Sequence, residues 1–91
     1  MGNKKLLTHH PYIIKKQGIQ GAQPCVKGTR ITVAALWNYY DVHGLSPREI
    51  SAQFPQLTLA VIFDALSYAS ENMTEIENIL KSEYQEIPEI L

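Results

Sequence analysis

Apolar residues follow two different periods along the chain, and the change of period divides a β-prone N-terminal part from a helical remainder. Short runs rich in β-branched residues stand at positions 12–14, 25–26 and 31–33. Gly28, which lies between the last two runs, suits the positive φ of a tight turn. The runs predict a short β-ribbon. Because strands of this length are marginal by themselves, we expect them to pair with another element or with a second copy of the chain.

Beyond Thr32 the spacing of apolar residues becomes helical. Thr32 is placed to cap the first helix and Gly44 to end it. Four apolar side chains recur between them at i, i+3, i+4 and i+7: Val33, Leu36, Trp37 and Tyr40. The sequence therefore predicts an amphipathic helix between Thr32 and Gly44.

A second helix has the sharpest local signal in the chain. Ser46 is an N-cap, Pro47 occupies the first helical position, and Glu49 completes an S-x-x-E capping box. Pro55 ends this helix near Phe54. A third helix is predicted to start at Thr58 and to run to about residue 71, with this apolar stripe: Leu59, Ile62, Phe63, Leu66 and Ala69.

A last amphipathic segment is expected over about residues 74–87. It opens at Thr74, with Glu77 three positions on as in a capping box, and Pro88 ends it. Its stripe consists of Ile76, Ile79, Leu80, Tyr84 and Ile87. The elements together predict a mostly α fold: a short N-terminal β-ribbon, a three-helix core of helix-turn-helix (homeodomain-like) type, and a C-terminal amphipathic helix. We expect residues 1–11 to form a flexible arm and residues 12–91 a single domain.

The composition is that of an ordinary globular chain. Of its 91 residues, 45% are apolar and 19% charged, which argues against wholesale disorder. No apolar run reaches the roughly 18–20 residues of a membrane span, and residues 1–8 lack the apolar stretch of a signal peptide. A single cysteine, Cys25, excludes an intramolecular disulfide and fits a reducing compartment. We therefore expect a cytoplasmic protein that does not contact membranes.

The net charge of −1 combines two parts of opposite sign. Residues 1–40 contain six basic residues and no acidic one, whereas residues 41–91 contain nine acidic and two basic residues. This division suggests a basic end for a polyanion and an acidic end for a basic partner. Charged side chains that merely solvate the two ends of a small domain explain it as well.

The second and third predicted helices have the lengths and the short connection of a helix-turn-helix, or of a plain helical hairpin. In the DNA-binding motif the second helix enters the major groove. Here residues 58–67 contain no Arg, Lys, Asn or Gln, the side chains that mainly read bases, and Asp64 would oppose a polyanion. Contacts to DNA are therefore expected from residues outside that helix: Lys15, Lys16, Lys27, Thr29, Arg30 and Arg48.

Two of these side chains have structural alternatives. For Thr29 we favour a local hydrogen bond within the turn at residues 27–30. For Arg30, a pair with a carboxylate of the helical core and a contact to phosphate both remain open.

Residues that could support catalysis or metal binding are scattered. Cys25 has no local base beside it, and a lone cysteine in a β-prone run is typical of buried filler. His9 and His10 stand far from His43 in the sequence, which is not a spacing of structural zinc ligands. We expect no enzyme activity, no metal site and no cofactor.

Residues 21–31 read G-A-Q-P-C-V-K-G-T-R-I and resemble the signature of the domain of unknown function 433 family. Residues 44–50, 54–58 and 65–68 are similar to its later blocks, so the resemblance covers roughly residues 10–71. It implies short strands followed by a helix-turn-helix, and the antitoxin half of a toxin–antitoxin pair with a PIN-like ribonuclease as partner. Gln23 stands where members often carry a basic residue, which argues against sequence-specific DNA binding.

The expected function follows from this resemblance and from the acidic C-terminal segment. The chain would be an antitoxin-like regulator that neutralises a PIN-like ribonuclease toxin, and whether it also binds its own promoter DNA stays open at this point. The segment would lie in a groove of the partner as an amphipathic helix, with these contacts: Ile76, Ile79, Leu80, Glu83, Tyr84 and Ile87. The alternatives are a stand-alone DNA-binding regulator and a homodimeric structural module without nucleic acid. A homodimer is expected in each case.

Overall fold

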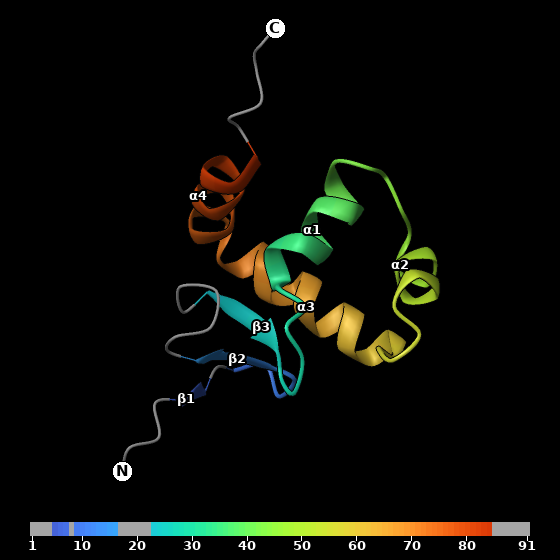
Figure 1. Cartoon of the computed structure of the whole chain (residues 1–91), viewed down its shortest axis with the longest axis horizontal. Coiled ribbons are helices and arrows are strands. Elements are labelled where there is room, and N and C mark those ends of the chain that lie inside the picture. Colours follow the sequence, from blue (N-terminus) through green and yellow to red (C-terminus); the bar gives the residue numbers. More distant parts are fainter. Residues whose placement is uncertain (1–4, 8, 17–22, 85–91) are drawn as a thin grey trace, which may run out of the picture.

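A three-stranded antiparallel sheet forms the N-terminal part of the computed structural model, which describes residues 5–7, 9–16 and 23–84 (Figure 1). The strands lie in the order β1 (Lys5–Leu7), β2 (Ile13–Lys16) and β3 (Pro24–Val26). In the central pair, Ile13 lies opposite Val26 and Ile14 opposite Cys25. The predicted ribbon pairs within the chain, so the short strands find their partners without a second copy.

Part of the expected N-terminal arm belongs to this sheet. Lys5–Leu7 pairs with β2, and His10 is buried against the third helix, with hydrogen bonds to Asp64 and Glu71. The β1 strand has only three residues, too few to show a period, and the His10 contacts join residues that are more than 50 positions apart along the chain.

Four helices follow the sheet: α1 (Val33–Asp41), α2 (Pro47–Gln53), α3 (Leu59–Glu71) and α4 (Met73–Tyr84). This order confirms the predicted fold class. The predicted N-caps of the first three helices are also confirmed. Thr32 accepts a hydrogen bond from the Ala35 amide and Thr58 one from the Val61 amide, while Ser46 and Glu49 form a complete reciprocal capping box.

The last helix starts one or two residues earlier than predicted. The helix begins at Met73, so Thr74 is its second residue and does not precede it. The first helical bond is donated by the Ile76 amide to the carbonyl of Asn72, over 3.1 Å. The preceding α3 ends at Glu71, and this short connection turns α4 back onto the core.

The core draws one large aliphatic side chain from the sheet and one from every helix. All five are at most 1% exposed: Ile13, Leu36, Ile50, Ile62 and Ile76. Burial of such side chains is the main force that holds a domain of this size together. Ile76 shows that α4 is packed into this core. Within the described ranges, no helix has the length and apolarity that crossing a membrane requires.

Candidate functional site

The α2–α3 pair, predicted as a helix-turn-helix, is joined by a turn with its own hydrogen bonds. The Leu57 amide donates to the carbonyl of Phe54 over 2.8 Å, and the Ser51 hydroxyl donates to the carbonyl of Leu57 over 3.1 Å. Leu57 itself is 3% exposed. The turn is thus held by burial and by polar contacts, which places α3 across the middle of the molecule (Figure 1).

The helix α3 presents three different faces to its surroundings. One face is buried against the other helices and includes Ile62 and Ala69. A second face meets the sheet side, where Asp64 and Glu71 bind His10. The third face is exposed and consists of Ala60, Phe63, Ser67, Ser70.

The exposure of Phe63 corrects the sequence prediction, which placed this side chain in the apolar stripe of the core. Phe63 is 56% exposed. At about 100° per residue around a helix, Phe63 falls between Ser70 and Ser67, on the side opposite to the buried positions. Spacing at i and i+4 from Leu59 places Phe63 at the edge of the predicted stripe, and only the packing of the other helices leaves this edge in water.

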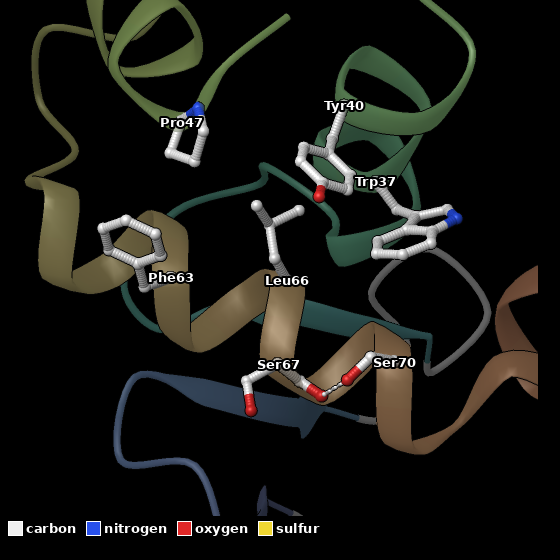
Figure 2. Close-up of a pocket in the computed structure, with 7 residues that line it drawn as sticks. All are labelled: Trp37, Tyr40, Pro47, Phe63, Leu66, Ser67 and Ser70. Carbon is white, nitrogen blue, oxygen red and sulfur yellow. Dashed lines mark hydrogen bonds between the residues drawn. The ribbon is translucent and has the colours of Figure 1, made fainter. Parts of the chain in front are cut away.

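A shallow hollow of about 410 Å³ lies beside Phe63. Figure 2 shows the side chains of three helices gathered around it. Phe63 stands opposite Pro47, and Leu66 lies between them and the rings of Trp37 and Tyr40. The surface around the hollow, called the aromatic surface below, is formed by Trp37, Tyr40, Pro47, Phe63, Leu66, Ser67 and Ser70.

Two rings of α1 form one side of the aromatic surface. The centroids of Trp37 and Tyr40 lie 5.3 Å apart, with the rings tilted by 46°. Tyr40 is 42% exposed, so this end of the predicted core stripe points out of the core. On the opposite side the Ser70 hydroxyl donates to the carbonyl of Ser67 over 2.9 Å. The lining carries no charged side chain.

Exposed aromatic side chains without neighbouring charges are typical of the centres of protein–protein interfaces. Trp, Tyr and Phe are enriched there and charged residues are depleted. Aromatic side chains that fill complementary pockets supply most of the binding energy. In the described part of the chain the large apolar side chains that are clearly exposed are Tyr12, Tyr40, Val42 and Phe63, and two of these four line the hollow.

The side chains predicted to contact DNA do not form one group. Lys27 and Arg30 are exposed on the turn between β3 and α1, and Arg48 is exposed on α2. Lys15 forms an ion pair of 2.8 Å with Glu75. The side chain of Lys16 lies outside the described residues. No carboxylate among the described residues pairs with Arg30, so that alternative is not realised there.

The turn at residues 27–30 has the expected geometry. Gly28 has φ of +79°. The Thr29 hydroxyl donates to the carbonyl of Val26 and accepts from the Ile31 amide, each over 2.9 Å. The favoured local role of Thr29 is thereby confirmed, and its hydroxyl is engaged within the turn.

Three of the α4 side chains predicted to bind a partner pack against the chain's own core. Ile76 is fully buried in the chain's own core, so it is unavailable to a partner. Ile79 and Leu80 are half-buried and pack against the same core. The side chains of Glu83 and Tyr84, and the whole of Ile87, lie outside the described residues.

Cys25 and the histidines are placed as follows. Cys25 is 3% exposed, burial raises the pKa of its thiol, and its Sγ donates to the carbonyl of Gln23. His9 and His43 are exposed, whereas His10 is buried between two carboxylates. Over residues 5–7, 9–16 and 23–84 no group of three or more histidine, cysteine or acidic side chains is arranged to hold a metal ion.

A family model described as "Protein of unknown function (DUF433)" matches residues 13–69, which is more than half of the chain. The chain belongs to this family. The DUF433 match includes six of the seven residues of the aromatic surface, up to Ser67, and ends before α4 begins.

A solved structure shares the fold. The crystal structure of a DUF433 member protein from Anabaena variabilis ATCC 29413 is similar with a TM-score of 0.63 and 27% sequence identity. The similarity covers 85% of this chain and 67% of that chain. No curated protein matches the chain.

Proposed function

We propose that this DUF433 chain is a non-catalytic regulator of the antitoxin type that binds a partner protein through the aromatic surface. The observation that carries the proposal is the exposure of Phe63 (56%) and Tyr40 (42%) around one hollow. The antitoxin role, and a PIN-like ribonuclease as the partner, come from the family resemblance of the sequence.

The chemistry of the surface favours a protein over a nucleic acid. A phosphate backbone is held mainly by Lys and Arg side chains, and the lining has neither. Covering an exposed phenylalanine with a partner instead stabilises the complex, by about 25 cal/mol for each Å² of apolar surface that is removed from water. The serine hydroxyls at the edge of the hollow supply hydrogen bonds to the rim of such an interface.

In this proposal the partner contacts α1 and α3, and not α4 as the sequence had suggested. Because Ile76 belongs to the core, a partner that used the apolar stripe of α4 would first have to unpack the domain. The acidic side chain Asp41 is exposed directly after Tyr40. A carboxylate at that position would favour a nuclease with a basic RNA-binding surface through charge complementarity.

The proposal is tested by measuring whether the chain neutralises the toxicity of a PIN-like ribonuclease in growing bacteria. Bacteria would express a PIN-like ribonuclease from the same genome together with the wild-type chain, with the double variant Phe63→Ser/Tyr40→Ser, or with Tyr12→Ser. Tyr12 is 41% exposed, almost the same as Tyr40, but lies on the sheet side, which makes it a matched control. We expect growth with wild type and Tyr12→Ser, and loss of growth with the double variant. Growth with a folded double variant would refute the role of the aromatic surface.

A second copy of the chain is the other occupant of this surface to be measured. Sedimentation of the same three proteins at about 10 to 100 μM, where weak dimers form, distinguishes a second copy of the chain from a different partner protein. If the wild type sediments as a dimer and the double variant as a monomer, the surface is a homodimer interface.

DNA binding is the second candidate function, and the exposed basic side chains of Lys27, Arg30 and Arg48 favour it. Such binding would be dominated by phosphate contacts and would weaken steeply as salt rises.

A further inference from the structure

His10 joins the N-terminal sheet to α3 through both nitrogens of its ring. Its Nδ1 lies 2.8 Å from Oδ1 of Asp64, and its Nε2 lies 2.8 Å from Oε1 of Glu71. The His10 side chain is 10% exposed, and that of Asp64 14%. Asp64 and Glu71 are seven residues apart on α3, two turns of the helix, so the ring spans two carboxylates along one helix face.

With both carboxylates ionised, this geometry requires a doubly protonated ring. Ionised carboxylates only accept hydrogen bonds, and a neutral imidazole has a single N–H. If His10 were neutral, one ring nitrogen would direct a lone pair at a carboxylate oxygen 2.8 Å away. Both bonds are therefore made only by the imidazolium ion, which also supplies the positive charge that balances Asp64 and Glu71.

Other polar contacts around the ring make it part of a larger junction. The second oxygen of Asp64 accepts a hydrogen bond of 2.9 Å from the Tyr12 amide, just before β2. The ring of Tyr68 meets the imidazole edge to face, with centroids 5.5 Å apart. From α4, Glu75 binds the Tyr68 hydroxyl and also Lys15 of β2.

We propose that His10 is a pH-sensitive clasp, which fastens the start of the sheet to α3 while its ring is charged and loosens it when the ring loses a proton. Among the described residues, the ionisable groups that face it are Asp64, Tyr68 and Glu71 on α3, with Glu75 on α4 and Lys15 on β2 behind them. The proposal does not depend on the partner or on the aromatic surface.

The direction of the effect follows from proton linkage. Burial by itself lowers the pKa of His10, and the hydrogen bonds and charges of Glu71 and Asp64 outweigh it, so that the pKa is raised above 6.5. When a group has a higher pKa in the folded state than in the unfolded state, its protonation stabilises the fold. This stabilisation is complete when the pH is below the pKa of the unfolded state. That stabilisation is lost as the pH rises through the folded value, so the clasp opens on the alkaline side.

The first test is an NMR titration of the full chain. The His10 ring resonances and the Tyr12 amide would be followed from about pH 5 to about pH 9, a range that brackets the histidine pKa. We expect both signals to change together, with a midpoint above 6.5. A Tyr12 amide that does not follow the ring, or a midpoint at or below 6.5, would overturn the clasp.

The second test uses a surface variant that folds without removing the buried ring. The Glu71 side chain is 60% exposed, and Glu71→Gln takes away one carboxylate from the ring. We expect this variant to lower the midpoint of His10, while Glu77→Gln, an exposed glutamate on α4, leaves it in place. Equal midpoints in wild type and Glu71→Gln would contradict the two-carboxylate bridge.

A third measurement compares urea midpoints of wild type, His10→Gln and the neighbouring exposed control His9→Gln. The difference in urea midpoint between wild type and His10→Gln should shrink by at least about half between pH 6 and pH 9, because the wild-type ring loses its charge over this range. His9→Gln should follow wild type throughout. A gap of constant size would show that His10 acts only through packing.

Discussion

The hydroxyl of Tyr68 donates a hydrogen bond of 2.9 Å to Oε1 of Glu75, and so connects α3 to α4 across their short junction. Burial, followed by the neighbouring Glu75, raises the pKa of Tyr68, so the phenol keeps its proton and remains a donor. The other oxygen of Glu75 accepts from Lys15 of β2 over 2.8 Å. Glu75 is thereby the point at which the sheet, α3 and α4 meet.

Removing this hydroxyl should destabilise the domain without unfolding it. We expect Tyr68→Phe to lower the free energy of unfolding by about 1.5–3 kcal/mol, the range for a hydrogen bond to a charged group. The control is Tyr12→Phe, because Tyr12 is 41% exposed and its change should stay within about 0.5 kcal/mol. Urea denaturation measures both, and equal effects would show that the Tyr68–Glu75 bond contributes nothing.

The burial of Ile76 predicts that α4 is required for stability. Ile76→Ala should cost about 2–5 kcal/mol, as for other large-to-small changes at fully buried positions. Glu77→Ala, at the next and exposed position, should change stability by no more than about 0.5 kcal/mol. If Ile76→Ala were as stable as wild type, α4 would not be needed for the core and could bind a partner through its apolar stripe.

The aromatic surface should be nearly neutral for folding. Phe63→Ser and Tyr40→Ser should each change the free energy of unfolding by less than about 1 kcal/mol, because these side chains are already about half in water. Leu66→Ala, a change at an 8% exposed position of the same hollow, should cost about 2–5 kcal/mol. If Phe63→Ser proved as costly as Leu66→Ala, Phe63 would be a core residue and not a docking residue.

The turn before α1 depends on the backbone of Gly28. Gly28→Ala should destabilise by about 1–2 kcal/mol, because φ is +79° and an L-residue with a Cβ is strained there. A Cβ at this position would meet no atom within 4 Å, so the cost is conformational and not steric crowding. Gly28→Asn should cost less, since Asn tolerates positive φ better. Equal melting temperatures for Ala and Asn variants would argue against this account.

DNA binding, if it occurs, should depend on the basic turn and not on α3. Lys27→Glu/Arg30→Glu should abolish binding to the DNA upstream of the gene, while Ser67→Ala should leave it unchanged. Each phosphate contact that is lost should reduce the slope of log affinity against log salt by about 0.9. Loss of binding in Ser67→Ala together with an intact double variant would place the DNA contact on α3.

The sequence by itself determined the four helices, the starts of the first three and the tight turn at Gly28. Thr32, Ser46 and Thr58 are N-caps because a short side-chain oxygen satisfies an amide within the first turn. Gly28 adopts positive φ because it has no Cβ. Each of these interactions spans at most a few residues, so its chemistry is readable from neighbouring residues, and the order of the four helices follows from it.

Only the tertiary structure decided which apolar stripe is covered and which is left in water. Phe63 and Ile76 both fit helical spacing, yet Phe63 is 56% exposed and Ile76 is fully buried. His10 was assigned to an arm, but two carboxylates more than 50 residues away hold its ring. Burial and long-range ion pairs depend on how the helices are packed, and a pattern along one helix carries no information about the element that will cover it.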